Sequence, residues 1–285
     1  MREKPEFLTV PELAELLRIK ERKVYDLAAS GDVPCTRATG KLLFPENEVR
    51  AWISKNQRGD RTVRPSVFLG SHDPLLEWAL RQSECGLATF FDGSSDGLRR
   101  FDLGEGIATG LHIRNEQGDG WNTGVVKAQF GRQDVVLLSW AKRRRGLVFR
   151  QDNALEGLDS LSGRRVAVRQ PSSGTSNLFN RLVSDAEVGE FSETAPYHSE
   201  QDAVLAVHEG DADVAFGLET FAHQFGLGFS PLVIEWFDLM VDRAAFFDPP
   251  FQTFLSFCES DRFRQRAASL AGYSVESVGE VRWNA

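Results

Sequence analysis

The sequence has few cysteines and no long apolar segment. Its three cysteines, Cys35, Cys85 and Cys258, are scattered and form no C-x-x-C pair. A disulfide framework is therefore improbable, and we expect a reducing, cytoplasmic environment. The longest largely apolar run covers only 135–141, far short of the roughly 18–20 residues that cross a bilayer. The charged first residues lead into no apolar signal core, so we expect no membrane partner.

The sequence also lacks the motifs of common enzymes. It contains no G-x-S-x-G elbow, H-E-x-x-H helix, Walker loop or dinucleotide fingerprint. None of its five histidines stands at metal-ligand spacing with cysteine or aspartate. We therefore expect no catalytic residues, no cofactor and no metal site. An enzyme of an unrecognised kind is the weakest of the alternatives.

What is present indicates a globular protein of two parts. The chain has 285 residues, of which 41% are hydrophobic, including 21 Phe and 6 Trp, so it has ample core material. This length suits one large domain or two ordinary ones. The net charge of −8 is unevenly distributed, because residues 1–65 carry a net charge of +3 and the remainder −11. A basic head on an acidic body indicates two parts with different partners.

Residues 7–56 have the pattern of a small helical module. Leucines at helical spacing follow Thr9, whose capping-box partner is Glu12, so a first helix is expected from there to about Leu17. A second helix is expected over 21–29 and ends at Gly31. Short strands at 33–38 and 42–44 would form a hairpin, and a third helix would cover 46–53.

The stretch "LTVPELAELLRIKERKVYDLAASGDVPCTRATGKLLFPENEVRAWI" resembles the excisionase-like, MerR-type winged helix-turn-helix. The resemblance implies binding to double-stranded DNA. Cations at a helix start suit phosphates and guanine edges, and Tyr25 either donates to a phosphate or packs. One such module has a small footprint, so a homodimer or higher homo-oligomer is expected. The DNA-contact predictions are Arg18, Lys20, Arg22, Lys23, Tyr25, Arg37 and Lys41.

Residues 57–65 are polar and basic and indicate a linker. From residue 66 the pattern alternates between strands and helices, which is typical of an α/β domain with mainly parallel sheets. The expected strands cover 67–70, 86–91, 107–113, 135–140, 165–169, 212–218 and 233–240. The expected helices cover 75–80, a segment from about 98, 177–183, 203–209, 220–224 and most of 251–271.

Three loops that precede these helices are rich in serine and glycine. They contain Ser71, the pair Ser94 and Ser95, and the segment 172–176. Hydroxyls and free backbone N–H groups at a helix start hold anions. Ligands of open α/β sheets bind at the carboxyl ends of the strands, so we expect a small-ligand site among these loops.

Residues 66–285 resemble the bilobal, type II periplasmic-binding-protein-like domain fused to helix-turn-helix modules in bacterial one-component regulators. The matching stretches include "LGSHDPLLEWAL", "GSSDGL", "LEGLDSLSGRRVAVRQPSSGTSNLF" and "DADVAFGLETFAHQFGLGFSPLVIEWFDLMV". The resemblance implies a first lobe of about 66–145 and 235–285, a second lobe of about 146–234, and a ligand such as molybdate or tungstate between them. The ligand contacts that follow are Ser71, His72, Ser94, Ser95, His112, Asn122, Arg169, Ser172, Ser173, Gly174, Thr175, Ser176 and Gly217.

The sequence departs from the pattern of these relatives at one position. Relatives often read "GSGTR", whereas here Ser176 stands in place of the arginine. Loss of this cation favours a less charged organic anion, although neutral donors alone also hold a tetrahedral oxyanion. Arg169 either supplies the missing cation or pairs with a nearby acid. His72 and His112 are either ligand donors or capped, surface histidines.

The sequence thus predicts a ligand-responsive, DNA-binding transcriptional regulator that senses a small oxyanion or small organic anion. In the alternative interpretation, the chain is an excisionase-like architectural DNA-binding protein. Its α/β domain is then a dimerisation scaffold that binds no ligand. The two interpretations differ in whether a small molecule stabilises the second domain.

Overall fold

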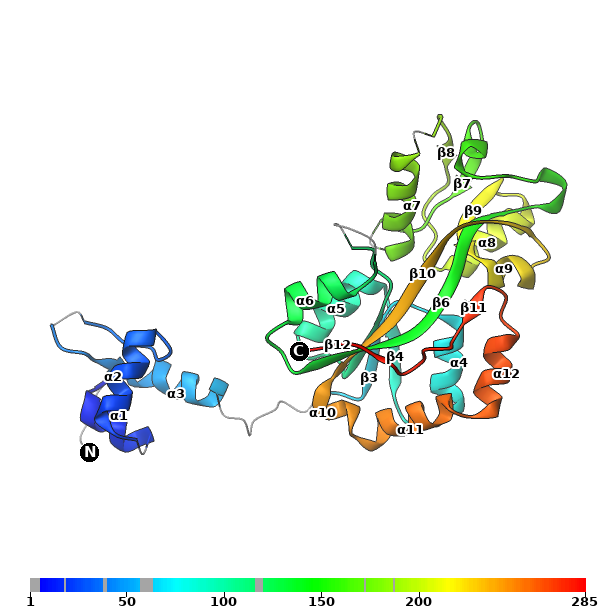
Figure 1. Cartoon of the computed structure of the whole chain (residues 1–285). Helices are drawn as coiled ribbons and strands as arrows, with labels where there is room; N and C mark the ends of the chain where they lie inside the picture. The colour runs from blue at the N-terminus through cyan, green and yellow to red at the C-terminus, as the bar shows by residue number, and fades with distance from the viewer. Residues whose placement is uncertain are drawn as a thin grey trace. The chain divides into compact units, whose positions relative to one another are not determined.

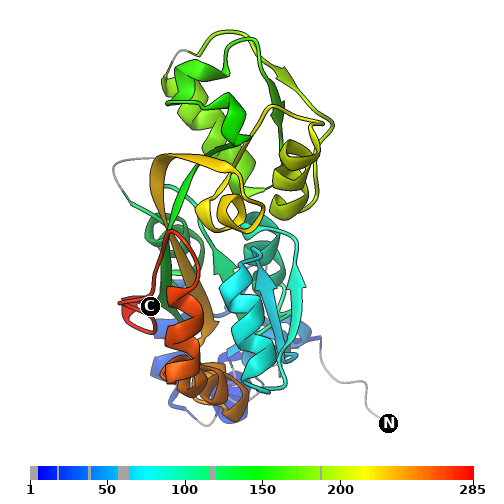
Figure 2. The same ribbon diagram turned by 90° about the vertical axis from the view of Figure 1, so that its right-hand side faces the viewer.

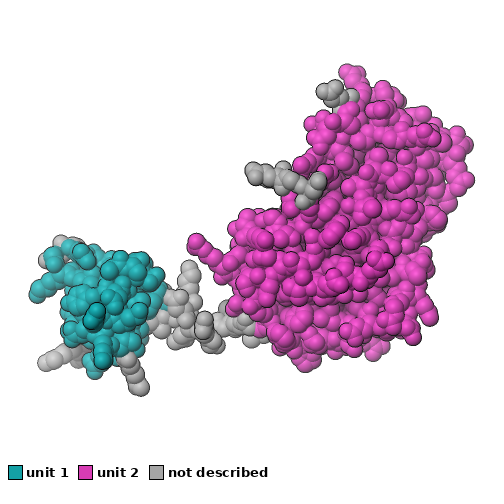
Figure 3. Space-filling view, in the orientation of Figure 1, with its two compact units in different colours: residues 1–63 teal, residues 64–285 magenta. Residues whose placement is uncertain are grey.

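The computed structural model describes residues 6–17, 19–37, 40–56, 64–115, 120–171, 173–186 and 188–285. The chain divides into two compact units, residues 1–63 and 64–285 (Figures 1 and 3). Two predicted contact residues, Arg18 and Ser172, lie outside the described residues. None of the described helices is long and apolar enough to cross a membrane.

The first unit is a helix-turn-helix with a hairpin. It contains β1 (Phe7–Leu8), α1 (Val10–Leu17), α2 (Glu21–Ser30), β2 (Phe44–Pro45) and α3 (Glu46–Asn56). Glu12 accepts hydrogen bonds from the backbone N–H and the hydroxyl of Thr9, which confirms the predicted start of the first helix. Gly31 ends α2 with a φ of +75°, a conformation that glycine adopts without strain. The fully buried core side chains are Leu13, Val24, Phe44 and Val49.

The hairpin of the first unit is shorter than expected. A single antiparallel bridge joins Thr36 to Leu43. Beyond it, β2 leaves the hairpin and pairs antiparallel with β1, so that Leu8 lies opposite Phe44. Strand β1 was not predicted, because two residues carry no periodic signal of their own.

The second unit is an α/β domain built on one curled sheet. Its strand order is β4-β3-β5-β10-β6-β9-β7-β8, and β11 and β12 also pair with β6. The pairs β3–β4, β3–β5, β7–β8 and β7–β9 are parallel, whereas β10 is antiparallel to β5 and β6. The bounds are β3 (Val67–Gly70), β4 (Ala88–Phe91), β5 (Ala108–Leu111), β6 (Val135–Phe149), β7 (Arg165–Ala167), β8 (Ser192–Glu193), β9 (Val214–Leu218), β10 (Gly228–Asp242), β11 (Tyr273–Ser274) and β12 (Val281–Asn284).

Nine α-helices are described in this unit. They are α4 (Pro74–Gln82), α5 (Ser94–Asp102), α6 (Thr123–Phe130), α7 (Gly174–Asp185), α8 (Glu200–Glu209), α9 (Glu219–Gln224), α10 (Arg243–Phe246), α11 (Pro249–Cys258) and α12 (Asp261–Ala268), and two single 3₁₀ turns cover Gln151–Asn153 and Leu158–Leu161. Helices α5, α7 and α8 begin three to four residues earlier than predicted. The first turns of α5 and α7 are serine- and glycine-containing segments that the sequence suggested were loops. Helix α8 begins at Glu200, directly after its cap Ser199.

The second unit has two lobes joined by two long strands (Figures 1 and 2). The first lobe holds β3–β5, α4–α6, α10–α12 and the C-terminal strands, and the second holds β7–β9 and α7–α9. Strands β6 and β10, each of 15 residues, run side by side through both lobes. We call β6 and β10 the hinge strands. Phe237, Phe251 and Phe254 are fully buried in the first lobe, as expected of core aromatics, whereas Phe247 is exposed.

Strand β6 is more than twice as long as predicted. The prediction ended at Trp140 because the following residues, Lys142 to Arg145, are all basic. A run of four cations normally lies on a solvated surface. Here Arg143 is 1% exposed and Arg145 is 0% exposed, and both side chains are paired with buried carboxylates, as described below.

Candidate ligand-binding site

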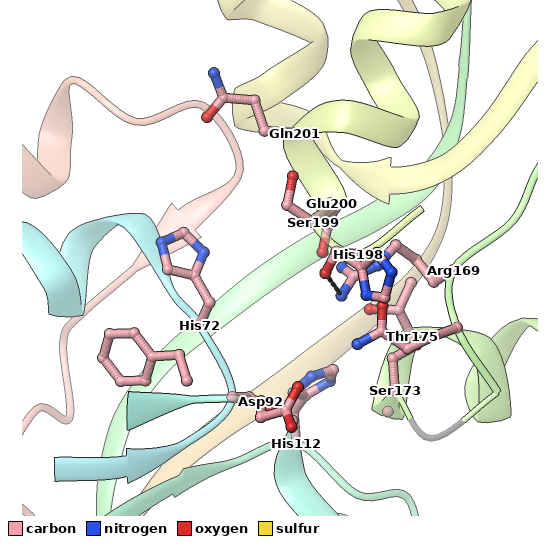
Figure 4. Close-up of a pocket in the computed structure, with 15 residues that line it drawn as sticks. His72, Asp92, His112, Arg169, Ser173, Thr175, His198, Ser199, Glu200 and Gln201 are labelled. Atoms are coloured by element: carbon pink, nitrogen blue, oxygen red, sulfur yellow. Dashed lines mark hydrogen bonds between the residues drawn. The ribbon is translucent and has the colours of Figure 1, made fainter. Parts of the chain in front are cut away.

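A cavity of about 290 Å³ lies between the two lobes. Figure 4 shows side chains of the first lobe, including His72 and His112, opposite those of the second, including Arg169 and Thr175. All segments that line it follow strands or begin helices. The lining residues are Ser71, His72, Phe91, Asp92, Gly93, His112, Arg169, Gln170, Ser173, Gly174, Thr175, His198, Ser199, Glu200 and Gln201.

The wall from the first lobe is formed by the ends of its parallel strands. Ser71 follows β3, Gly93 follows β4 and His112 follows β5. The buried hydroxyl of Ser94 joins two of these loops, since it lies 2.7 Å from the hydroxyl of Ser71 and accepts a hydrogen bond from the backbone N–H of His112. Ser94 therefore holds the loops of Ser71 and His112 together without lining the cavity itself.

The wall from the second lobe contains two helix N-termini. Ser173 caps α7 by accepting from the backbone N–H of Ser176, and Ser199 caps α8 by accepting from that of Asp202. The first turns of both helices line the cavity. Free backbone N–H groups and the helix dipoles make such ends favourable for negative charge.

Arg169 supplies a cation to the same wall. Its guanidinium donates to the backbone carbonyls of Tyr197, at 3.2 Å, and His198, at 2.8 Å. Within the described ranges it makes no ion pair with a carboxylate. Burial lowers the pKa of Arg169, but a guanidinium remains protonated at neutral pH. The two carbonyls thus hold a positive charge at the cavity without neutralising it.

A buried ion network lies beneath the cavity, on the hinge strands. Glu235 of β10 is 0% exposed and pairs with Arg143 and Arg145 of β6. The Nδ1 atom of His112 lies 3.0 Å from the Oε2 atom of Glu235. Burial raises the pKa of Glu235, but the two guanidinium groups offset this effect and hold its pKa well below the usual range. Glu235 is therefore a carboxylate at all physiological pH values.

The network extends from Glu235 into both lobes. In the first lobe, Arg143 donates to Asp73, which also accepts from the indole of Trp140 and the hydroxyl of Tyr273. In the second lobe, Arg145 lies 3.0 Å from the carboxylate of Glu200, at the start of α8. The hinge is therefore connected by charge to a helix whose first turn lines the cavity.

The structure brings seven of the predicted ligand contacts together. Five others, Ser94, Ser95, Asn122, Ser176 and Gly217, do not line the cavity. The hydroxyl of Ser94 lies against that of Ser71, and the backbone N–H of Ser176 donates to Ser173. Ser95 lines a neighbouring hollow of about 160 Å³, together with Arg114 and Arg181. The seven residues at the cavity are Ser71, His72, His112, Arg169, Ser173, Gly174 and Thr175.

Asn122 and Gly217 were predicted as ligand contacts but do not line the cavity. Asn122 is fully buried, accepts from the backbone N–H of Ile113 and donates to Asp238 at 2.6 Å. It therefore fixes the segment between β5 and α6 to a hinge strand. Gly217 lies inside β9, where a Cβ atom would come within 3.1 Å of a methyl group of Val204, so α8 packs closely against this strand.

The sequence did not suggest the segment 198–201 as part of the site. Its signal was present, because Ser199 and Asp202 form an S-x-x-D capping pattern. The pattern was not used because the expected helix began only at 203. Gln170 and Asp92 also line the cavity and were not predicted. Each lies near a predicted contact in the sequence but belongs to no motif of its own.

The predicted DNA contacts that are described all lie at the surface of the first unit. Lys20, Arg22 and Lys23, at the start of α2, are exposed, and none makes an ion pair within the described part of the unit. Tyr25 is 54% exposed. Tyr25, Arg37 and Lys41 line one shallow hollow between the helices and the hairpin, so the structure brings them to one face.

No metal-binding cluster of three or more His, Cys, Asp or Glu side chains occurs among the residues that the structure describes. All three cysteines are free thiols, of which only Cys35 is exposed.

Comparisons with known proteins identify both units. A model of the PBP superfamily domain matches residues 77–259, more than half of the chain, and the chain therefore belongs to this family. A model of a helix-turn-helix domain matches residues 7–57. The protein described as uncharacterized protein YvgK of Bacillus subtilis (strain 168) is 22% identical over 301 residues, which covers 96% of both chains.

Two solved structures are similar to the second unit. An ABC-type phosphate transport receptor from Vibrio cholerae covers 73% of this chain and 98% of its own, with 15% identity and a TM-score of 0.49. The regulatory domain of CcmR from Synechocystis PCC6803, in complex with 2-PG, covers 67% and 92%, with 12% identity and a TM-score of 0.47.

Proposed function

We propose that the chain is a DNA-binding transcriptional regulator that senses a small anion in the cavity between its lobes. The observation that carries this proposal is the cation of Arg169, which faces a cavity of about 290 Å³ and has only backbone carbonyls as partners among the described residues. The same chain holds a helix-turn-helix domain. No catalytic step is part of the proposal.

The chemistry of the cavity supports an anionic ligand. Two helix N-termini and an unneutralised guanidinium line one wall, and each favours negative charge. The volume suits a ligand at the small end of the usual range of roughly 300–1,000 Å³. A small oxyanion, molybdate and tungstate included, or a small organic anion fits these features.

The hinge strands supply the proposed route from ligand to DNA. In this mechanism the anion contacts both walls and favours closure of the second lobe, residues 146–234, on the first, residues 66–145 and 235–285. Closure alters how two protomers of a homodimer present their helix-turn-helix domains. A coupling of about 1–3 kcal/mol gives a 5- to 150-fold change in DNA affinity.

The first unit supports binding to double-stranded DNA in the manner of excisionase-like, MerR-type modules. Lys20, Arg22 and Lys23 form an exposed cationic start of α2, suited to a major groove. Tyr25, Arg37 and Lys41 lie on the face that would meet the flanking backbone. A regulator of this kind acts in the cytoplasm, where bacterial DNA lies.

The test is a thermal-shift screen of the full chain. The panel contains molybdate, tungstate, sulfate, phosphate, amino acids and small organic acids. Ligand at a hundredfold excess over its dissociation constant stabilises by about 2.7 kcal/mol, so a concentration-dependent rise in Tm is expected for at least one compound. A flat response over the whole panel would contradict the proposal and favour the architectural alternative, in which the α/β domain is a scaffold.

A further inference from the structure

The two ring nitrogens of His112 have different surroundings. The ring is 5% exposed, lines the cavity, and stacks on Phe237 with ring centroids 5.8 Å apart. Its Nδ1 atom faces Glu235 at 3.0 Å. Its other nitrogen, Nε2, has no hydrogen-bond partner among the described residues. A Cβ atom on Gly174, at the first turn of α7, would lie 3.1 Å from Nε2.

Glu235 forces the proton of the ring onto Nδ1. The guanidinium of Arg145 donates to both carboxylate oxygens, each at 2.9 Å, and Arg143 donates to one of them. A carboxylate with these donors stays ionised and only accepts hydrogen bonds. The contact with His112 is therefore a hydrogen bond from Nδ1–H to Glu235.

The ring itself is neutral at pH 7. Burial has the largest effect and lowers the pKa of His112. The contact with Glu235 offsets part of this shift, and the positive charges of Arg143 and Arg145 lower the pKa further. Helix α7 contributes only Gly174 beside the ring. The other charged groups at the cavity are Asp92, Arg169 and Glu200, and Glu200 pairs with Arg145. A neutral imidazole with its proton on Nδ1 has a lone pair on Nε2.

We propose that the cavity binds an anion that also donates a hydrogen bond to Nε2 of His112, that is, a hydroxy acid or a protonated phosphate. Anions that are fully deprotonated at neutral pH, such as sulfate, molybdate and tungstate, are rejected. The inference rests on the proposed function, because it assumes that the cavity binds an anion. It narrows the ligand class from any small anion to one with a donor.

The selectivity follows from the free-energy cost of burying the lone pair of Nε2 of His112 without a hydrogen-bond donor. An anion without a proton places an oxygen lone pair against that of Nε2, and both are then withdrawn from water without a partner. Sites built to hydrogen-bond a ligand hydroxyl reject analogues without it strongly. We expect at least roughly 100-fold weaker binding of the donor-free member of an isosteric pair.

The first experiment determines the tautomer of His112 in the full, ligand-free chain by ¹⁵N-imidazole NMR at pH 7.5. The expected spectrum has a protonated Nδ1 and an unprotonated Nε2, assigned with the variant His112→Phe. A protonated Nε2, either in the other tautomer or in an imidazolium ring, would overturn the inference. This outcome does not depend on any ligand and leaves the proposed function standing.

The second experiment compares three matched pairs by calorimetry with the full chain at pH 7.5. The pairs are phosphate and sulfate, glycolate and acetate, and malate and succinate. Binding confined to the first member of a pair is the expected result. Equal binding of both members of a pair at pH 7.5 overturns the inference but not the proposed function. Absence of binding for all six, together with a response to another anion of the thermal-shift panel, also overturns the inference and leaves the proposed function standing. A flat response over that whole panel contradicts the proposed function, and the inference fails with it.

Discussion

The Nδ1 atom of His112 lies 3.0 Å from the carboxylate of Glu235, and this contact joins the cavity to the ion network of the hinge strands. Glu235 is bound in turn by Arg143 and Arg145, and Arg145 contacts Glu200 at the start of α8. His112, which lines the cavity, is therefore linked through three contacts to Glu200 on the opposite wall. In the proposed mechanism this arrangement connects ligand binding to the relation between the lobes.

The substitution Glu235→Gln tests the network. It removes the charge that compensates two buried guanidinium groups, and breaking a buried ion pair from one side costs about 3–5 kcal/mol. We expect the free energy of unfolding of the second domain to fall by that amount in urea titrations. The matched control is Glu105→Gln, since Glu105 pairs with Arg100 at the surface, where the loss is at most about 1 kcal/mol. Similar losses in both variants would show that the network contributes little.

The substitution Arg169→Gln tests the cation of the cavity. A hydrogen bond to a charged group contributes about 1.5–3 kcal/mol, so the affinity for a bound anion is expected to fall roughly 10- to 150-fold. Arg165→Gln is the matched control. Arg165 begins β7, the strand that ends two residues before Arg169, and it is exposed and also donates to a backbone carbonyl. An anion that binds both variants equally well does not contact Arg169.

Asp238 predicts a pH dependence of stability. Burial raises the pKa of Asp238 to about 6, even though Arg282 and Asn122 donate to it. Its Oδ1 atom has no hydrogen-bond partner among the residues that the structure describes. The native state therefore binds more protons than the unfolded state between about pH 4 and pH 6. The stabilisation is complete below this window and is lost as the pH rises through it.

The measurement is the difference in unfolding free energy between the natural protein and Asp238→Asn over pH 4–7. Relative to the variant, the natural protein should lose about 3 kcal/mol across the window. A difference that does not change with pH, or that changes in the opposite direction, would show that the carboxyl group is ionised throughout.

The substitution Arg22→Ala tests the DNA-binding surface. Loss of a base contact typically weakens specific binding by about 1–3 kcal/mol. The probe is DNA selected by the full chain from a random-sequence pool. Arg50→Ala is the control, because Arg50 is an exposed arginine of α3 that pairs with Glu46. If both variants bind the selected DNA as the natural protein does, Arg22 is not a contact.

The sequence predicted those features whose signals are local. Thr9, Glu12 and Gly31 mark helix ends by themselves, and the serines at 71 and 173 follow strands with clear apolar runs. These short-range patterns were sufficient to predict the helix-turn-helix, the α/β class of the second domain and most of the loops that line the cavity.

The features that the sequence did not predict depend on distant partners. Arg143 and Arg145 gave the impression of a surface run because their partner Glu235 lies 92 and 90 residues further along the chain. Asn122 resembled a ligand contact because nothing local shows that Asp238 binds it. Burial of a charge is decided by tertiary pairing, which residue spacing does not reveal.

The affinity for DNA with and without bound anion tests the central claim most directly. The full chain would be titrated onto its selected DNA at a saturating concentration of the anion that raises its Tm most. The account predicts a 5- to 150-fold change in the Kd for DNA, and predicts that Arg169→Gln needs a roughly 10- to 150-fold higher anion concentration to reach the same change. A Kd that is the same with and without the anion in the natural protein would contradict it.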